Sequence, residues 1–237
     1  MARMPNTAPI WARPEPGSRR PRFTREQLAA AALAIADAEG FDAVSMRRVA
    51  TELGAGTMTL YHYVRTKDDL VALMDDAIMT EVLIPDGELP TRWRAALTAI
   101  AHRTREVLMR HPWALHSLRD ARMGPNAMRH AEQSFAALAH TDLDAAGKVT
   151  LVGMVDDYVH GNASRTAELR ARAADGDPSV DFVRTQLRTG GYPHLQAVFG
   201  SGAMDRITGP VAEQQRFERG LQALLDGATV LMGLPRE

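Results

Sequence analysis

Apolar residues along the chain recur at the spacing that places them on one face of an α-helix. The first such stripe comprises Leu28, Ala32, Ile35 and Ala36. The capping box Thr24-Arg-Glu-Gln27 precedes this stripe, and Gly40 follows it as a residue suited to a helix end. The pattern therefore predicts a helix that is capped by Thr24 and ends at Glu39.

Two short helices should follow, joined by a glycine-containing turn. Ser45 is a good N-cap for a helix that buries Met46, Val49, Ala50 and Leu53. Gly54-Ala55-Gly56 then interrupts the chain, and a second short helix is expected from about Thr57 to Val64. This arrangement matches the helix-turn-helix motif. A fourth helix should begin at the capping box Thr66-Lys-Asp-Asp69 and continue to about Leu83.

The remainder of the chain is also predicted to be helical. Pro85 to Pro90 marks a boundary, and no segment alternates with the period of two that a strand requires. Further helices are expected at about 91–110, 112–119, 126–140, 143–173 and 211–232, with two short ones within 174–210. We therefore predict an all-α fold: a tail over 1–22, a helix-turn-helix three-helix domain over 23–83 and a larger helical domain over 91–237.

Composition narrows the class of protein. The 237 residues include no cysteine, which excludes disulfides, thiolate metal sites and cysteine nucleophiles. The longest purely apolar run, from Leu28 to Ala36, is too short to span a bilayer, and the first residues lack the apolar core of a signal peptide. We expect a cytoplasmic protein that has no membrane partner.

Charge is distributed unevenly, although the net charge is only −1. Residues 1–67 contain more basic than acidic side chains, whereas residues 68–81 contain acids alone. A basic front end of this kind suggests a nucleic-acid partner. Residues 1–22 hold five arginines and no periodic apolar face, so they are interpreted either as a solvated tail or as a flexible basic arm that lies along DNA.

Cations stand where helix stability alone would not place them. Arg47 and Arg48 fall in the first turn of a predicted helix, and Lys67 opens another. A cation at a helix N-terminus costs roughly 0.3–1 kcal/mol, because the helix dipole is positive there. Phosphate groups would bind these helix ends and these side chains together.

The segment from Leu53 to Lys67 contains no acidic residue, as a surface that follows a phosphate backbone requires. Its side chains offer the mixture of hydrogen-bonding groups and apolar tips that suits a major groove: Thr57, Met58, Thr59, Tyr61, His62 and Tyr63. The alternative for Tyr61 and Tyr63 is that they are half-buried packing residues.

Residues 24–83 resemble the DNA-binding domain of the tetracycline-repressor (TetR/AcrR) family. The residues that carry the resemblance are Gly40-Phe41, Ser45 to Ala50, Glu52-Leu-Gly54, Thr59-Leu-Tyr61, Tyr63-Val64 and Lys67 to Leu70. The resemblance implies that Arg47 reaches a base edge, that Thr57, Met58 and His62 select sequence, and that Thr59, Tyr61 and Lys67 clamp phosphate. Tyr63 stands where many members have His, and Gly56 where many have a Ser cap. With Ser45 and Arg48, these residues complete the predicted interface to double-stranded operator DNA.

The resemblance also implies a helical ligand-binding and dimerisation domain over residues 91–237. Two apolar stripes are the expected homodimer interface, with burial inside one subunit as the alternative: Leu151, Val155 and Val159; and Phe217, Leu221, Leu224, Leu225, Ala228 and Met232. The candidates for contact with a small-molecule effector, each otherwise an ordinary core residue, are His102, Met109, His111, Trp113, His116, Met123, Phe135, Met154 and Tyr158.

No constellation of catalytic residues is apparent. No nucleophile is paired with a base, and no cofactor motif is complete. Asp156, Asp157 and His160 fall on one helical turn, where a solvated face is a more ordinary explanation than a metal site. The sequence thus favours a ligand-responsive repressor without a cofactor. The alternatives are an enzyme with a vestigial helix-turn-helix and a ligand-independent DNA-binding protein.

Overall fold

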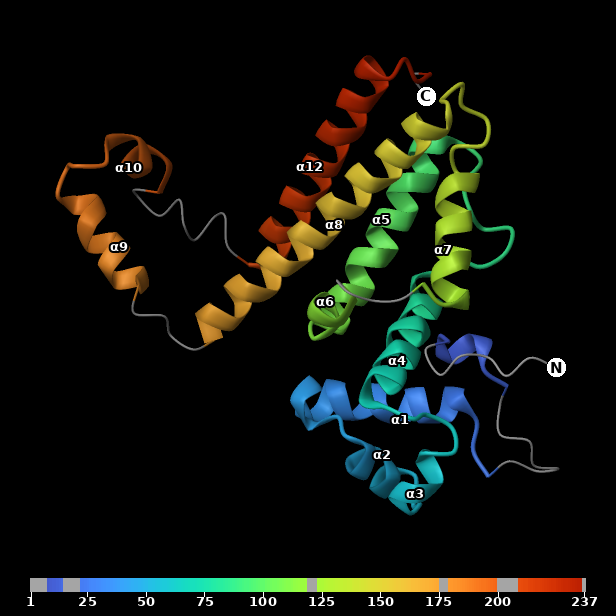
Figure 1. The fold of residues 1–237 in the computed structure, drawn as a ribbon. Helices are drawn as coiled ribbons and strands as arrows, with labels where there is room; N and C mark the ends of the chain where they lie inside the picture. Colours follow the sequence, from blue (N-terminus) through green and yellow to red (C-terminus); the bar gives the residue numbers. More distant parts are fainter. Residues whose placement is uncertain (1–7, 15–21, 119–122, 175–178, 200–208, 236–237) are drawn as a thin grey trace. The chain divides into compact units, whose positions relative to one another are not determined.

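The computed structural model describes residues 8–14, 22–118, 123–174, 179–199 and 209–235, and within these ranges it contains helices and no strand. The all-α prediction is therefore confirmed. The chain forms two compact units, Met1–His140 and Thr141–Glu237. Figure 1 labels the helices of both units.

The first half of the first unit is the helix-turn-helix head. It comprises α1 (Arg25–Glu39), the 3-10 turn η2 (Phe41–Ala43), α2 (Met46–Glu52), α3 (Thr57–Leu60) and the start of α4 (Lys67–Val82). The capping boxes act as predicted, because Thr24 accepts from the Gln27 amide and Thr66 from the Asp69 amide. Side chains from all four helices form one core, which includes Leu28, Ile35, Val49, Leu60 and Leu70.

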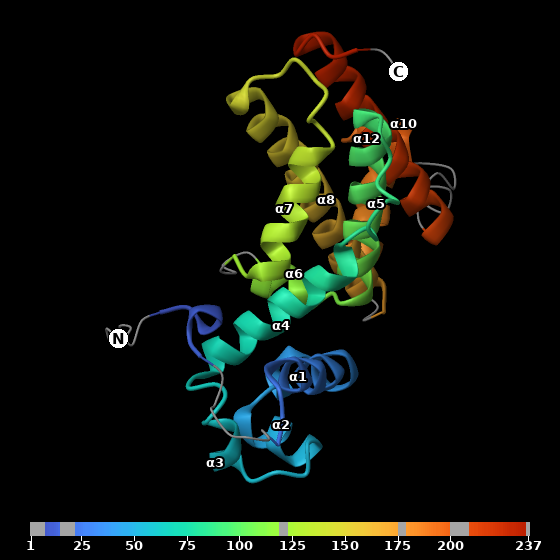
Figure 2. The ribbon, with the colours of Figure 1, turned by 90° about the vertical axis from the view of Figure 1, so that its right-hand side faces the viewer.

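Helix α4 connects this head to the rest of the first unit. It packs against α1, and also against α5 (Trp93–Arg110), α6 (Ala114–Ser117) and α7 (Pro125–Ala136). Figure 2 shows α4 running from the level of α1 towards α5 and α7. Buried Leu70, Leu73 and Met74 belong to the head core, whereas the carboxylate of Asp76 accepts hydrogen bonds from the first turn of α7.

Part of the segment expected to be a tail is folded instead. Residues 8–14, hereafter the strap, contain the 3-10 turn η1 (Ile10–Ala12), and Ile10 is buried in the head core. Burying an isoleucine side chain contributes about 1.5–3 kcal/mol, which explains why this stretch packs although it lacks a periodic apolar face. The remaining residues of the predicted arm, 1–7 and 15–21, lie outside the described ranges.

The second unit contains the long helix α8 (Ala145–Ala174) and α12 (Pro210–Leu231), which pack against each other. The short helices α9 (Ser179–Arg188) and α10 (Pro193–Phe199) lie between them in the sequence and pack together. The aromatic rings of Tyr158 and Phe217 stack at 5.6 Å between centroids, which joins α8 to α12.

Most of the predicted dimer stripe is covered within one chain, where α8 packs against α12. Its buried members are Leu151, Val155, Val159, Phe217, Leu221, Leu225 and Ala228. This burial agrees with the alternative that the stripes pack within one subunit, and the dimer interface stays a prediction. Leu224 and Met232 remain partly exposed.

Candidate nucleic-acid interface

The start of α2 gives its two neighbouring arginines different surroundings. The Ser45 hydroxyl caps the helix by accepting from the Arg48 amide at 3.2 Å. The Arg48 guanidinium donates to Glu39 at 2.6 Å and to Glu52 at 2.8 Å, and these two carboxylates raise the pKa of Arg48. Arg47 is exposed, and within the described ranges its guanidinium forms no ion pair. The structure therefore presents Arg47 to solvent and ties Arg48 to acids of the head.

The turn between α2 and α3 depends on glycine. Gly54 has φ +61°, a left-handed conformation that other residues adopt at a cost, and Gly56 is the N-cap of α3 without a side chain to cap it. Helix α3 is only four residues long, shorter than predicted. The chain leaves the helix after Leu60, and the amides of Tyr63 and Val64 both donate to the Leu60 carbonyl.

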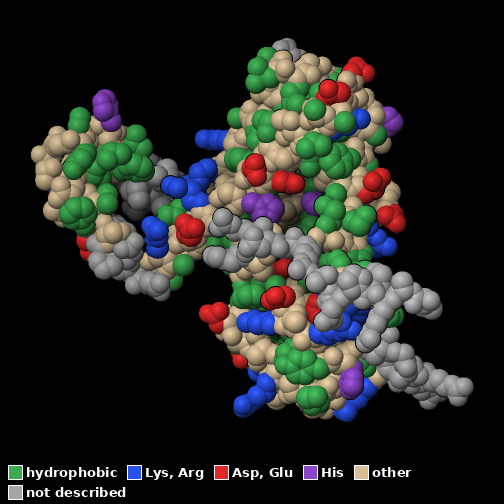
Figure 3. Space-filling model, viewed as in Figure 1, with side chains coloured by type: hydrophobic (Ala, Val, Ile, Leu, Met, Phe, Trp, Pro, Cys, Tyr) green, Lys and Arg blue, Asp and Glu red, His purple; other side chains and the backbone are tan. Residues whose placement is uncertain are grey.

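The residues of α3 and the following turn form an exposed surface with one buried anchor. Leu60 is fully buried, whereas Met58 is 75% exposed and Tyr61 43% exposed. Thr57 and Thr59 are half-buried and His62 is exposed. On the face drawn in Figure 3, the end of the head that carries α3 shows hydrophobic, basic and histidine side chains together. We call Arg47, Met58, Tyr61, His62 and Lys67 the exposed set.

Tyr63 does not join this surface. Its side chain is 8% exposed, its ring meets Phe23 edge to face at 6.4 Å, and its hydroxyl accepts from the Phe23 amide at 3.2 Å. The packing alternative therefore describes the Tyr63 side chain in this structure. Tyr61, the C-cap of α3 two positions earlier, is exposed instead.

Lys67 opens α4 on the same surface. The Thr66 hydroxyl accepts from the Asp69 amide at 3.0 Å, which fixes the first turn of the helix. The Lys67 ammonium lies 5.5 Å from the centre of the Phe41 ring, and the side chain remains exposed. An exposed cation beside a helix N-terminus is a suitable phosphate ligand, since the helix amides add their own positive charge.

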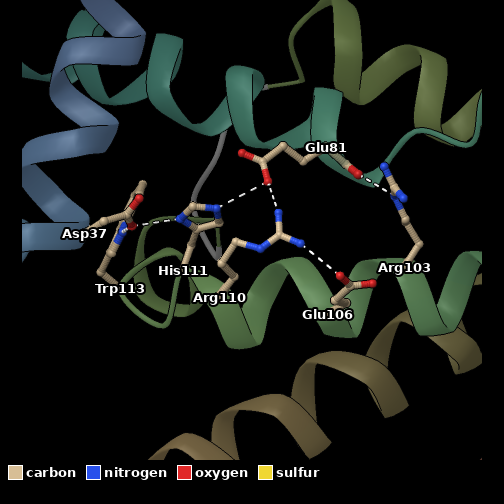
Figure 4. Close-up of polar contacts among 7 residues, drawn as sticks. All are labelled: Asp37, Glu81, Arg103, Glu106, Arg110, His111 and Trp113. Atoms are coloured by element: carbon tan, nitrogen blue, oxygen red, sulfur yellow. Dashed lines mark hydrogen bonds and ion pairs between the residues drawn. The ribbon is translucent and has the colours of Figure 1, made fainter.

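Two of the effector candidates, His111 and Trp113, form contacts that join elements of the first unit (Figure 4). His111 is buried, with Nδ1 2.7 Å from Asp37 of α1 and Nε2 3.4 Å from Glu81 of α4. The Trp113 indole donates to the same oxygen of Asp37 at 2.8 Å and stacks on Phe41. These contacts join α1 to α4 and to the turn after α5, and they leave neither polar group for a ligand.

Arginines complete this network. Arg110 pairs with both Glu81 and Glu106, and the Arg103 guanidinium donates to the Glu81 carbonyl at 2.7 Å. The resemblance to the tetracycline-repressor family made His111 an effector candidate, because it sits near where tetracycline-binding relatives have a drug-contacting His. The two acidic partners of His111 lie 74 and 30 positions away in the chain, so no local pattern could have indicated this structural role.

The other effector candidates are divided between the two units. His102 and Met109 of α5 are half-buried, whereas Met123 and Phe135 are exposed. Met154 and Tyr158 belong to the second unit, where the Tyr158 hydroxyl donates to the Phe217 carbonyl at 2.8 Å. The side chain of His116 lies outside what the structure describes.

Two buried carboxylates of α4, Asp75 and Asp76, were not among the residues predicted from sequence to be important. Asp75 is buried, and burial raises its pKa to about 6 although the Ser117 hydroxyl donates to it at 2.7 Å. Burial also raises the pKa of Asp76, whose oxygens accept from the Asn126 and Ala127 amides and so cap α7. The acid run over 68–81 was the only available signal.

Burial likewise raises the pKa of Asp156 on α8, which the nearby charge of His160 partly opposes. The ring Nδ1 of His160 lies 2.9 Å from the Asp156 carbonyl. Among the described residues, no group of three or more histidines and acids is arranged to hold a metal ion. Nor does any helix in the described ranges have the length and apolarity needed to cross a bilayer.

Comparison with known proteins accounts for both parts of the chain. Residues 28–74 match the family model of bacterial regulatory proteins of the tetR family, and residues 86–232 match the tetracyclin repressor-like C-terminal domain. The HTH-type transcriptional repressor DrrR1 of Streptomyces coeruleorubidus is 36% identical over 233 residues, covering 94% of this chain and 83% of DrrR1. An HTH-type transcriptional regulator of Saccharopolyspora erythraea is 34% identical over 228 residues, covering 95% of this chain and 93% of that protein.

Solved structures agree with these matches. Apo ActR from Streptomyces coelicolor superposes with a TM-score of 0.73 at 28% identity, covering 91% of this chain and 99% of ActR. ActR in complex with actinorhodin gives a TM-score of 0.65 at 27% identity, covering 88% and 97%. The chain belongs to the TetR family of helix-turn-helix transcriptional regulators. Because its curated relatives are regulators, the alternative of an enzyme with a vestigial helix-turn-helix is set aside.

Proposed function

We propose that this regulator is a ligand-responsive repressor. It binds a palindromic operator as a homodimer and releases it when a small apolar or aromatic molecule binds the helical body. The observation that carries the proposal is the exposed surface of the acid-free segment from Leu53 to Lys67, together with the exposed Arg47 of α2. A surface for DNA needs exposed cations, hydrogen-bonding groups and apolar tips, and this segment offers them without a carboxylate of its own.

Each residue of the surface has a distinct task in the proposal. Arg47 contacts a base edge, and Met58 and His62 read sequence with the half-buried Thr57. Tyr61 and Lys67 bind phosphate with Thr59. Ser45 and Gly56 act through the backbone amides of the helices that they precede. Arg48 keeps its two carboxylate partners and orients the start of α2.

A dimer is required because one short helix reads few base pairs. A twofold dimer places two recognition helices about 34–36 Å apart, which matches successive major grooves. Because most of the predicted stripe is covered within one chain, the surface proposed to meet a second copy consists of apolar side chains left exposed on α8 and α12. These side chains are Val149, Met154, Leu169, Val211, Val230 and Leu231, with the partly exposed Leu224 and Met232.

Response to a ligand follows from differential binding to two states of the dimer. A coupling free energy of about 1–3 kcal/mol weakens operator binding roughly 5- to 150-fold. Thermodynamic linkage then requires the operator to weaken ligand binding by the same factor. ActR, with which this chain shares its fold, has been solved with actinorhodin and with (S)-DNPA. Actinorhodin is therefore a reasonable first probe.

Selection of duplexes from a random pool with the purified protein tests the DNA-binding half of the proposal. The expected result is an inverted repeat whose half-site centres are about one helical turn apart. Recovery of duplexes without any shared sequence would contradict it and favour the ligand-independent alternative. Titration of actinorhodin into the operator complex then tests the other half. Equal affinity for actinorhodin with and without operator would contradict linkage for that compound.

A further inference from the structure

The strap is held to the head by an ion pair that sequence reasoning did not find. The Arg13 guanidinium donates to both oxygens of Asp69, at 2.7 and 2.8 Å. The two side chains are only 14% and 8% exposed, so the pair is largely removed from water. Two parallel hydrogen bonds between a guanidinium and a carboxylate fix both distance and orientation.

The rest of the strap is built to present Arg13. Its Nε donates to the Ala8 carbonyl at 2.7 Å, which folds the strap back on itself. Arg25, a buried residue of α1, donates to the Arg13 carbonyl at 3.1 Å and to the Pro14 carbonyl at 3.3 Å. Ile10 anchors the same segment in the head core. Ala8 thus contacts the guanidinium itself, whereas Arg25 and Ile10 hold the backbone that carries it.

Asp69 is the residue that organises the turn into α4. Besides Arg13, one of its oxygens accepts from the Arg65 amide at 2.9 Å, and its own amide donates to the Thr66 hydroxyl. Burial would raise the pKa of Asp69, but Arg13 and the backbone amides outweigh burial and lower it. The carboxylate therefore holds Arg13 on one side and the 65–66 backbone on the other.

Lys67 follows this turn directly, which links the strap to the DNA surface. The Thr66 hydroxyl already caps α4, and Asp68 lies in the same first turn, so the helix does not need a distant arginine to begin. What Arg13 adds is a fixed position for the Asp69 carboxylate and hence for residues 65–67. A phosphate clamp needs such fixing, since a misplaced cation loses its contact.

We propose that Arg13 is a positioning residue for DNA binding. Through Asp69, it holds the turn over residues 65–67 so that Lys67 and the first amides of α4 meet a DNA phosphate. The inference rests on the proposed phosphate contact of Lys67. It assigns to the strap an indirect role in binding, through Asp69, in place of the direct contact with DNA expected of a basic arm.

Binding of the selected operator duplex to full-length variants tests this role. Arg13→Gln should weaken binding about tenfold and flatten the slope of log affinity against log salt by about one, as Lys67→Ala should. In the double variant the losses should be clearly less than additive, because both changes remove the same phosphate contact. A purely structural role would lower the melting temperature without this dependence on Lys67.

Arg170→Gln is the matched control. It breaks an ion pair with the buried Glu213 in the second unit, and it should leave the salt slope unchanged. All binding is measured at a temperature where circular dichroism shows each variant folded. If Arg13→Gln does not fold, Arg13→Lys keeps the charge but loses the bidentate geometry, and it should weaken binding about threefold.

The possible outcomes separate this proposal from the proposed function. Wild-type affinity and salt slope in Arg13→Gln, or in Arg13→Lys where only that variant folds, would overturn the role of the strap while Lys67→Ala still shows DNA binding. Fully additive losses in the double variant would overturn it as well. If the wild-type protein bound no duplex, both proposals would fail together.

Discussion

Charged side chains have opposite surroundings in two regions of the head and of α4. The first region is the surface around α2, α3 and the start of α4, and the second is the buried side of α4, which carries Asp69, Asp75 and Asp76. On the first, Arg47 and Lys67 are exposed cations without a carboxylate partner among the described residues. On the second, Asp69, Asp75 and Asp76 are buried, and each accepts hydrogen bonds from a different segment. The first region thus leaves two cations exposed to solvent, whereas the second satisfies its carboxylates with hydrogen bonds.

The difference separates charges that stabilise the fold from charges that can serve a ligand. A buried carboxylate must be hydrogen-bonded or protonated, because leaving it unpaired costs several kcal/mol. An exposed cation has no such requirement and remains available to bind an external anion. Ion pairing with carboxylates therefore distinguishes Arg48 from Arg47. Residue type and position in the helix could not distinguish them.

Gly124, the N-cap of α7, should tolerate no added volume because it lies against Asp76 of α4. A methyl group there would lie 2.2 Å from a carboxylate oxygen of Asp76 and 2.7 Å from the Trp11 ring. Gly124→Ala should therefore lower the free energy of unfolding by about 3 kcal/mol, as measured by urea titration. Gly161→Ala on α8, with open space around its Cα, should instead gain up to about 1 kcal/mol. Equal stability of the two variants would contradict close packing at this site.

Asp75 should make stability depend on pH. Its folded pKa of about 6 exceeds the ordinary 3.8, so its contribution is present below pH 4 and is lost as the pH rises through 6. Asp75→Asn keeps an acceptor for Ser117 without the charge. It should raise the free energy of unfolding by about 2 kcal/mol at pH 8 and by little at pH 4. Parallel pH profiles of variant and wild type would refute a raised pKa.

Arg47→Ala should relax sequence preference. We expect the free-energy gap between operator and random duplex to shrink by about 1–2 kcal/mol, because a base contact is lost. Competition binding at fixed salt measures this gap. An unchanged gap would remove Arg47 from the residues that read sequence and would weaken the distinction between open and paired charges.

Arg48→Ala should have the smallest effect. Its ion pairs with Glu39 and Glu52 lie on an exposed surface, where each contributes at most about 1 kcal/mol. Operator affinity should therefore change by less than about threefold, since the guanidinium already has partners. A loss as large as that in Arg47→Ala would show that Arg48 leaves its carboxylates to contact DNA.

Local patterns predicted the parts of the fold that depend on neighbours in sequence. Thr24, Ser45 and Thr66 cap the helices that their spacing indicated, because capping involves residues only three positions apart. The short helix α3 ended earlier than its pattern suggested. Tyr61 and Tyr63 could not be told apart, since burial of one ring depends on Phe23, which is 40 positions away.

Contacts between distant segments were beyond the reach of the sequence. Arg13 and Asp69 are 56 positions apart, and nothing in either neighbourhood indicates the other. The stripes on α8 and α12 were correctly identified as apolar faces that become buried. An apolar stripe indicates that a helix face is buried, but it does not indicate whether the covering helix belongs to the same chain. In this structure α8 and α12 of one chain cover each other.

Chemical modification of the two lysines reports on whether the start of α4 contacts DNA. The chain contains only Lys67 and Lys148, one at the start of α4 and one on α8. Their acetylation rates can be followed by mass spectrometry with and without the selected operator duplex. Operator is expected to slow acetylation of Lys67 strongly and to leave acetylation of Lys148 unchanged. Equal acetylation of Lys67 in the free and DNA-bound protein would contradict a DNA interface at the start of α4.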